Sequence, residues 1–380
     1  MEQWDDIVVG AGILGLAHAY HLGRQGRRVL VCERHARAQG ASVRNFGMIW
    51  PIGQPIGEMY DLALRSRAFW LNLLPAAGLW YAPVGSLHLA YHPDEAQVLF
   101  EFSEAAKTNG FQGIQLFPSF EVGARFGAVR PEGLRGALFS ETEVCVDPRE
   151  VVARLPDFLT ARFGVTFRFG TAVTHSEAGT VRLADGRTAR GQVYVCSGDE
   201  MGVLYPRQFR EMGLLRCKLQ MLRTEPMGEW MLGPMLAAGL TLCHYRSFAH
   251  CPTLPALKER LEREMPEYRR YGIHVMASQN GRGELTLGDS HEYDDAISVF
   301  DSEEIDRLVL SYLATFLKAD FRVTSRWNGI YVKHPEKPYV IARPEPNVTL
   351  VTGVGGAGMT LSFGLAEKVV MEQRAGTDRP

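Results

Sequence analysis

The sequence predicts an α/β fold in which a nucleotide-binding domain is assembled from discontinuous segments and carries an inserted α+β domain built on an antiparallel sheet. The first observation is the stretch DIVVGAGILG at residues 6–15, where a short apolar strand leads through three glycines into a helix. The second is the interleaving of strands and helices at both ends of the chain and in residues 147–198. The third is a series of antiparallel-looking strands between those segments. This pattern is typical of a Rossmann-like domain that is interrupted twice.

The three glycines of the first motif have separate physical roles. Gly10 permits the tight turn, Gly12 lets the backbone approach a pyrophosphate, and Gly15 lets the helix pack against the strand. The N-terminus of that helix offers unpaired N–H groups and a partial positive charge. The next strand ends at Glu33, about 20 residues further on, where a carboxylate can accept hydrogen bonds from ribose hydroxyls. This context predicts a dinucleotide site.

The remaining elements follow from periodicity and turn signals. Apolar spacing predicts helices at residues 16–23, 58–74, 94–110, 148–163, 254–271, 303–317 and 361–374. Alternating or short apolar runs predict strands at residues 7–9, 28–32, 85–91, 134–139, 144–146, 165–169, 172–176, 180–183, 192–196, 215–223, 236–245, 273–278, 284–289 and 348–352. Asp147 is expected to cap the helix that begins near Pro148. We therefore assign residues 1–84, 146–208 and 326–380 to the nucleotide-binding domain, and residues 85–145 and 209–325 to a substrate-binding domain.

The composition indicates a globular protein whose partner is a small molecule. The 380 residues are 46% hydrophobic, and 41 basic and 43 acidic residues give a net charge of −2. Such a balance offers no electrostatic surface for nucleic acid or an anionic membrane. The longest apolar stretch, residues 230–243, is interrupted by glycine and proline and is too short for a membrane span. We expect a small-molecule partner and no membrane span.

The cysteines and the N-terminus predict a cytoplasmic location. Six cysteines are scattered without a C-x-x-C pair, as expected of buried thiols in a reducing compartment. The first strand begins within a few residues of Met1, which leaves no room for a signal peptide.

Residues 41–57, ASVRNFGMIWPIGQPIG, contain too much glycine and proline for a regular element. A long loop inside a compact domain is usually functional, although a surface connection is the alternative. The loop follows directly after the predicted ribose carboxylate, so we expect it to contribute to the same site.

A second glycine cluster, GVGGAGMT at residues 353–360, distinguishes between cofactors. It lies between a strand and a helix, so it directs a second positive helix end into the cleft. A nicotinamide enzyme has no evident need for this feature, whereas a flavin gains negative charge near N1 and the C2 carbonyl on reduction. A glycine-rich turn without a ligand is the alternative, but the cluster favours a flavin.

Five motifs together resemble those of the D-amino-acid oxidase, glycine oxidase and sarcosine oxidase superfamily. They are GAGILG with Glu33, ASVRNFG, Asp147-Pro148, Trp327-Asn328-Gly329 and GVGGAGMTLSFGLAE. The resemblance covers essentially the whole chain and implies an FAD-binding domain with a β-rich substrate domain. The longer stretch ASVRNFGMIWPIGQPIG further resembles a bacterial subgroup proposed to act in aminophosphonate breakdown.

The resemblance also implies site residues. FAD contacts are implied for Gly10, Gly12, Ile13, Leu14, Gly15, Glu33, Arg34, Ser42, Arg44, Asn45, Phe46, Gly47, Met48, Val173, Ser197, Gly198, Gly356, Ala357, Gly358, Met359 and Thr360. Within this set, Val173 is implied beside the adenine, and the last five beside the flavin pyrimidine. Met48 and Trp50 are implied near the isoalloxazine.

The chain departs from the family pattern at two places. Relatives resembling glycine oxidase carry a carboxylate-binding arginine two residues after the glycine of W-x-G, and this chain has Tyr331 there. Relatives with covalent flavin carry a cysteine near the same place, and this chain has none after Cys251. We therefore expect non-covalent FAD and an anion site without the arginine fork.

Several cationic or hydrogen-bonding residues could replace that arginine and hold a phosphonate or another anion. They are Lys218, His244, Arg246, His250, His291, Lys333 and His334. The alternatives are surface positions for Lys333, His334 and Arg246, and hydrogen bonding in the core for His244 and His291. No metal site is predicted, because no His or Cys pair has ligand spacing on one element.

The resulting hypothesis is FAD-dependent oxidation of a small primary or secondary amine, with hydride transfer to flavin N5 and reoxidation by O2. An aminoalkylphosphonate or its N-methyl form is the preferred substrate, and Tyr331, His291 and Trp50 are expected to position it, together with Lys333, His244 and Met48. A glycine-like or sarcosine-like amino acid, or a dehydrogenase with another acceptor, are the alternatives within amine oxidation. A binding protein with a vestigial site and an enzyme using only nicotinamide remain as alternatives of other classes.

Overall fold

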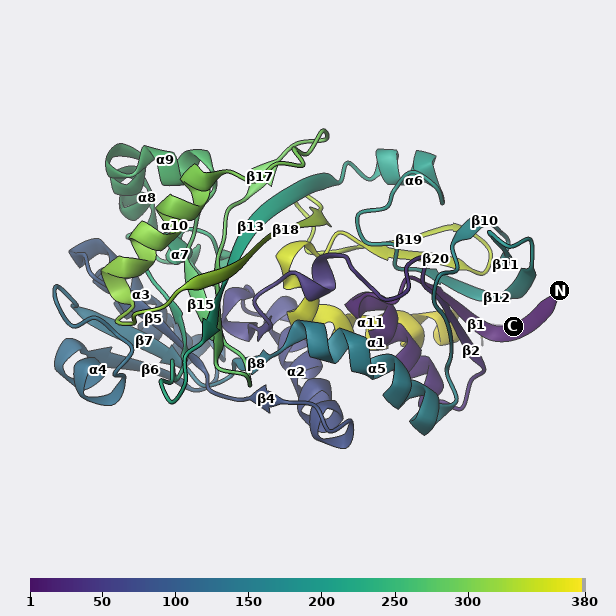
Figure 1. Ribbon diagram of the computed structural model, residues 1–380, viewed down its shortest axis with the longest axis horizontal. Helices are drawn as coiled ribbons and strands as arrows, with labels where there is room; N and C mark the ends of the chain where they lie inside the picture. Colours follow the sequence, from purple (N-terminus) through teal and green to yellow (C-terminus); the bar gives the residue numbers. More distant parts are fainter. Residues whose placement is uncertain (378–380) are drawn as a thin grey trace.

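The computed structural model describes residues 1–377, without the side chains of 375–377, and contains two large sheets with a small third sheet between them. Figure 1 shows the sheets side by side along the long axis, with β1, β2 and β12 toward one end and β5, β6 and β7 toward the other. An α/β fold with a Rossmann-like domain and an inserted domain on a largely antiparallel sheet is thus confirmed.

The nucleotide-binding sheet has eight strands in the order β10-β11-β12-β1-β2-β9, with β20 paired to β12 and β19 to β20. Strands β1, β2, β9, β12 and β20 pair in parallel, and of these β1, β2, β12 and β20 bury apolar side chains. The strands are β1 (Glu2–Val9), β2 (Val29–Cys32), β9 (Thr166–Arg168), β10 (Val173–Glu177), β11 (Thr180–Leu183), β12 (Thr188–Val195), β19 (Val340–Glu345) and β20 (Val348–Thr352). The helices of this domain are α1 (Ile13–Gly23), α2 (Glu58–Ala76), α5 (Pro148–Phe163), α6 (Pro206–Glu211) and α11 (Gly358–Thr377).

Helices α1 and α11 pack against each other although they lie at opposite ends of the chain. His21 on α1 hydrogen-bonds the carbonyl of Phe363 on α11 at 2.8 Å, and Tyr20 packs edge-on against the Phe363 ring. Both helices begin at the same edge of the sheet, after β1 and β20 respectively. This packing brings the two glycine clusters of the sequence to one site.

The second sheet has nine strands in the order β17-β13-β16-β15-β14-β5-β7-β6, with β18 also paired to β13. All its pairs are antiparallel except β14 with β5. The strands are β5 (Ser86–Ala90), β6 (Ile114–Pro118), β7 (Gly136–Ser140), β13 (Leu215–Pro226), β14 (Met235–Ala237), β15 (Met276–Gln279), β16 (Glu284–Gly288), β17 (Glu292–Tyr293) and β18 (Val323–Lys333). The helices are α3 (Pro93–Asn109), α4 (Ser119–Arg125), α7 (Gly239–Leu242), α8 (Leu254–Glu264), α9 (Pro266–Arg270) and α10 (Glu303–Phe316).

The small third sheet joins the two domains. It contains β3 (Met48–Ile49), β8 (Val144–Val146) and β4 (Tyr81–Ala82), with β8 in the middle. Directly after β8, the Asp147 side chain accepts hydrogen bonds from the backbone N–H groups of Arg149 and Glu150, which confirms the predicted helix cap. The long loop 41–57 therefore crosses between the domains as β3 flanked by two short 3₁₀ turns.

Three sequence predictions differ from the structure. The predicted strand 236–245 is the short strand β14 followed by helix α7, because an apolar run without alternation can be buried in either form. The predicted helix 254–271 is divided into α8 and α9, since Pro266 cannot continue a helix. Residues 326–333, assigned above to the nucleotide-binding domain, lie in β18, which pairs with β13 of the other sheet.

Candidate functional site

A cavity of about 1050 Å³ runs from the first glycine cluster, past the second, to the substrate-domain sheet. Nearly all of the predicted cofactor residues and all six predicted substrate-side residues line it. The exceptions are Gly15 and Gly47, which do not line the cavity. A side chain at Gly15 would place its Cβ 1.9 Å from the Gly10 carbonyl oxygen, and one at Gly47 would lie 2.0 Å from that of Val146. These two glycines therefore act through close backbone packing.

The first glycine cluster is shaped by sterics and by one carboxylate. Gly10 has a φ of +99°, and a Cβ there would lie 2.5 Å from the Cys196 carbonyl oxygen. The buried Glu33 carboxylate accepts hydrogen bonds from the N–H groups of Ala11 and His35, each at 3.0 Å. Glu33 thus holds the glycine turn in place while it also lines the cavity.

The N-terminus of α1 opens into this end of the cavity. Its cap residue Gly12 has no capping side chain, but the Ser42 hydroxyl accepts a hydrogen bond from the Ile13 N–H at 2.9 Å. The remaining orphan N–H groups of the first turn give a site for a diphosphate. Loop 41–57 therefore reaches the cofactor end, as its position in the sequence predicts.

Loop 41–47 is held by its own polar side chains. The Asn45 amide donates to the carbonyls of Ala41 and Ser42 and accepts from the Gly47 N–H. Arg44 donates to the carbonyl of Gln39 at 2.7 Å and to that of Asn328 on β18 at 3.1 Å. Arg44 therefore connects the loop to the strand that carries Tyr331.

The second glycine cluster faces the middle of the cavity. Gly353 and Gly355 have φ values of +74° and +58°, which turn the chain between β20 and α11. The Thr360 hydroxyl accepts a hydrogen bond from the Trp50 N–H at 2.9 Å, so this turn is fixed to loop 41–57. Two helix N-termini, those of α1 and α11, consequently line one cavity, and both favour negative charge.

Tyr331 lies where the cofactor end and the substrate end meet. Its ring is 3.8 Å from the position that a Cβ at Gly356 would take, and its centroid is 6.3 Å from that of His291. Burial raises the pKa of Tyr331 well above its ordinary value, so its hydroxyl remains a neutral donor. Trp50 is also buried, with Tyr245 6.2 Å and His88 5.5 Å away between ring centroids.

Lys333 supplies a cation at the same wall. Its amine donates to the Tyr293 hydroxyl at 2.7 Å and lies 4.2 Å from the centroid of that ring. Within the described part of the chain Lys333 forms no ion pair, and burial lowers the pKa of its amine. By contrast, the cavity residue Arg246 is occupied by the carbonyls of Pro335 and Glu336.

The other predicted anion ligands are engaged elsewhere, and two of them, Lys218 and His250, do not line the cavity. Lys218 is buried and pairs with Asp301 at 3.1 Å, and His250 packs against the Phe102 ring at 5.6 Å between centroids. His334 lines the wall, but its Nδ1 accepts hydrogen bonds from the N–H groups of Glu336 and Lys337. These three side chains therefore have structural partners.

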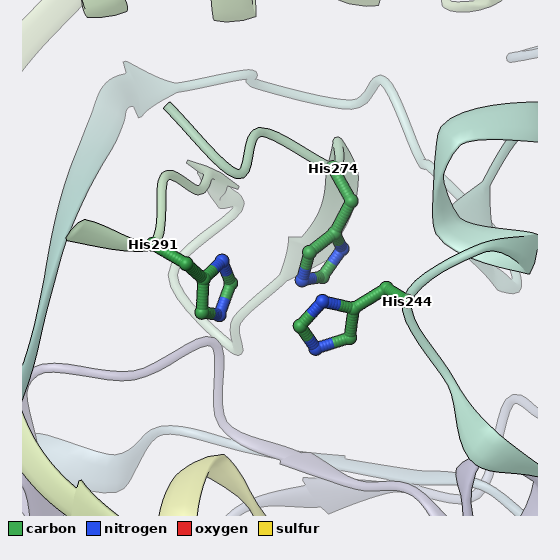
Figure 2. Close-up of side chains that lie close together, drawn as sticks. All are labelled: His244, His274 and His291. Carbon is green, nitrogen blue, oxygen red and sulfur yellow. The ribbon is translucent and has the colours of Figure 1, made fainter. Parts of the chain in front are cut away.

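Folding also assembles a cluster of three histidines, which we call the histidine cluster: His244, His274 and His291 (Figure 2). His244 follows α7 rather than lying on a strand, His274 precedes β15, and His291 lies between β16 and β17. One nitrogen of each ring lies within 4.8 Å of the others. The sequence predicts no metal site because it has no ligand pair on one element, and it gives no signal for His274, because each member comes from a separate segment.

His274 and His291 are buried, whereas the His244 ring is exposed toward the cavity. Burial lowers the pKa of His291 to about 4 and that of His274 well below its ordinary value. The buried Asp289 carboxyl lies 3.2 Å from His274 Nε2 and 4.0 Å from His291 Nε2, and burial raises its pKa well above the usual range. His291 Nδ1 donates to the Gly272 carbonyl at 3.0 Å.

Known proteins resemble this chain over most of its length. The sequence profile of the family described as "FAD dependent oxidoreductase" matches residues 5–371. A glycine oxidase of Bacillus licheniformis is 24% identical over 271 residues, covering 68% of this chain and 69% of that protein. A D-amino acid dehydrogenase of Methylobacterium sp. (strain 4-46) is 28% identical over 268 residues, covering 55% of this chain and 63% of that protein.

The fold has solved counterparts. The crystal structure of glycine oxidase from Geobacillus kaustophilus superposes with a TM-score of 0.79 at 18% identity, covering 98% of this chain and 95% of that one. At this identity the similarity shows the fold alone. No helix of residues 1–377 combines the length and apolar character required to cross a bilayer.

Proposed function

The chain belongs to the family of FAD-dependent oxidoreductases, and we propose that it oxidises a small primary or secondary amine carrying an anionic group, with an aminoalkylphosphonate or its N-methyl form as the preferred substrate. The observation that carries this proposal is the cavity wall formed by Tyr331 and Lys333. It lies beside the second glycine cluster and has a half-buried cation without a carboxylate partner among the described residues.

FAD fits the residues of the cavity. Gly10 leaves no room for a Cβ, the Glu33 carboxylate lines the cavity where it would hold the ribose of FAD, and the two helix N-termini would stabilise the negative charge of its diphosphate and flavin pyrimidine. The cavity, of about 1050 Å³, continues past the two glycine clusters to Tyr331 and Lys333, where a small substrate would lie. All six cysteines precede β18, in keeping with non-covalent binding.

When bound, FAD supplies the acceptor for the hydride that leaves the substrate carbon next to nitrogen. Hydride loss requires a free lone pair on that nitrogen, so the substrate must react as the neutral amine. Buried Trp50 and Met48 provide an apolar wall that disfavours the ammonium form, because burial penalises charge. Water then hydrolyses the imine to an aldehyde or keto acid and an amine or ammonia, and O2 is reduced to hydrogen peroxide.

The anionic end of the substrate is assigned to Lys333 and Tyr331. An ammonium is a compact point charge that suits a tetrahedral phosphonate, whereas a planar carboxylate is best held by a guanidinium fork. The neutral Tyr331 hydroxyl adds a hydrogen bond to the same group. Binding of one end positions the reacting carbon, which contributes to catalysis through orientation.

A peroxide-coupled screen of the FAD-loaded protein tests this function. The panel contains aminoalkylphosphonates, their N-methyl forms, glycine, sarcosine and uncharged amines. We expect peroxide with the phosphonates and a much lower kcat/KM for amines of equal length without an anionic group. Equal turnover of charged and uncharged amines would contradict the assignment of Lys333.

Oxidation of a glycine-like or sarcosine-like amino acid is the second candidate, and the similarity to glycine oxidase favours it. The similarity to a D-amino acid dehydrogenase favours an acceptor other than O2. Repeating the screen with an artificial electron acceptor separates these cases, because a dehydrogenase would reduce the dye without forming peroxide. A protein that stays colourless after FAD loading would exclude all of them.

A further inference from the structure

We propose that the histidine cluster, with Asp289 beside it, is a binding site for a divalent transition metal of the zinc class at the substrate end of the cavity. Three imidazoles converge there from three segments of the substrate domain, and one nitrogen of each lies within 4.8 Å of the others (Figure 2). Zinc–nitrogen bonds are about 2.0–2.1 Å long, so three ligands around one ion stand roughly 3.3 Å apart. Modest side-chain rotation closes this difference.

The orientation of His291 fits a ligand role. Its Nδ1 donates to the Gly272 carbonyl at 3.0 Å, so its only proton is on that side and its Nε2 lone pair is directed toward Asp289. A ligand histidine in metalloproteins typically donates its second nitrogen to a carbonyl or carboxylate in this way, which fixes both tautomer and ring position. His291 is therefore prepared as an acceptor.

His274 adds an unsatisfied polar atom beside the Asp289 carboxyl. His274 Nδ1 is buried and has no hydrogen-bond partner in the described structure, and the Asp289 Oδ1 atom has only the His274 Nε2 atom near it, at 3.2 Å. Buried polar atoms in native proteins are nearly always paired, so an unpaired ring nitrogen beside two other imidazoles is consistent with a ligand at this place. His244 completes the set from the open side, because its ring is accessible from the cavity whereas the other two are buried.

The chemistry of the cluster favours a cation over the substrate's phosphonate. The available imidazole proton of His291 is already used, and the Asp289 carboxyl contacts two of the three rings. The Nε2 atom of His291 thus offers a lone pair, which can bind a cation but not an anion. The positive charge of Lys333 opposes a cation, but its amine contacts Tyr293 and not the rings.

A metal at this place has open coordination positions facing the cavity through the His244 side. Those positions suit the oxygens of a carboxylate or phosphonate, which would replace the arginine missing at Tyr331. This anchoring role rests on the proposed function, whereas the metal site itself does not depend on it.

Calorimetric titration of the FAD-loaded protein, made without a polyhistidine tag and stripped with a chelator, tests the site with ZnCl2 alone. We expect one equivalent of Zn²⁺ to bind, and H274A to weaken the affinity at least tenfold. H250A is the matched control, because His250 lies in the same domain but packs on Phe102 away from the cavity, and it should bind as the wild type does. Retained FAD absorbance and near-ultraviolet circular dichroism verify that each variant is folded.

If H274A does not fold, H244A provides the same comparison, since His244 faces the cavity. Absence of stoichiometric Zn²⁺ binding, or equal affinity in the wild type and H244A, overturns the proposal. The proposal is also overturned if Zn²⁺ fails to bind, methylphosphonate binds to the metal-free protein, and H244A abolishes that methylphosphonate binding. Zinc binding without oxidation of any amine would contradict the proposed function and leave the metal site standing.

Discussion

The two ends of the cavity are built in different ways. At the cofactor end the wall consists mainly of backbone: Gly10 and Gly12, the second glycine cluster, and the first turns of α1 and α11. At the substrate end the wall consists of side chains from distant segments, such as Tyr331, Lys333 and the histidine cluster. A site built from backbone depends on the conformation of the chain and much less on the identity of the side chains. A side-chain site can change its chemistry by single substitutions on an unchanged sheet.

The largest effect is expected from a substitution in the backbone site. G10A introduces a Cβ 2.5 Å from the Cys196 carbonyl oxygen at a φ of +99°. Because the turn must shift, we expect the free energy of FAD binding to become less favourable by about 3 kcal/mol or more, which is at least about 100-fold weaker binding. The flavin absorbance after loading and gel filtration measures this. G26A is the matched control, because Gly26 also has a positive φ but open space around it. Equal loss in both variants would show that the contact with Cys196 is irrelevant.

The substrate end is tested by removing its unpaired cation. K333M is expected to raise KM for anionic amines by about 10–100-fold with little change for uncharged ones, because a charge-assisted hydrogen bond contributes about 1.5–3 kcal/mol. Steady-state kinetics with a charged and an uncharged amine of equal length measure the difference. K337M changes an exposed lysine at the same cavity and should leave KM within about twofold. Similar changes for both amines would remove Lys333 from the anion site.

The stability of both domains against acid depends on buried neutral histidines. Burial lowers the pKa of His18 and His21 in the nucleotide-binding domain to about 4, and that of His88 in the substrate domain to about 3. These groups are neutral in the folded chain and become protonated on unfolding below about pH 6.5. Their stabilising effect is therefore complete above that pH and decreases as the pH falls toward 4.

Protonation of each such histidine in the unfolded chain should lower the free energy of unfolding by about 2 kcal/mol at pH 5 relative to pH 8. H88L is expected to remove one such contribution, so its unfolding free energy should fall less steeply between pH 8 and pH 5 than that of the wild type. Urea denaturation at a series of pH values measures this slope. H175L, at an exposed position, should keep the steeper wild-type dependence. Identical slopes for H88L and the wild type would mean that His88 is solvated or paired.

The smallest effect is expected from exchanging one anion ligand for another. Y331R supplies the guanidinium fork that the family pattern has at this position, and we expect the ratio of kcat/KM for glycine over an aminophosphonate to rise by about tenfold. Y331F retains the ring without the fork and should not shift the ratio toward glycine. If Y331R leaves the ratio of kcat/KM for glycine over the aminophosphonate unchanged, the anionic group of the substrate does not bind at β18.

The cofactor end was predictable because its signals are local. Strand β1, the three glycines and the Asp147 cap each depend on backbone dihedrals and hydrogen bonds within short stretches of chain, and Glu33 bonds the Ala11 N–H 22 residues away within one strand–helix–strand unit. Residues 236–245 were not predictable to the same degree, because an apolar run is compatible with both strand and helix until its neighbours are known. The assignment of 326–333 to one domain depends likewise on pairing with β13, more than 100 residues away in sequence.

The sequence by itself determined the α/β class, the two glycine clusters and the flavin family, because conformational freedom at glycine and the charge of a helix N-terminus are encoded within about ten consecutive residues. Only the tertiary structure decided that α1 and α11 begin at one cavity, that Lys333 has no ion-pair partner among the described residues, and that His274 joins His244 and His291. The reason is physical: those properties depend on distances between segments that packing of the two sheets sets and that sequence separation does not reveal.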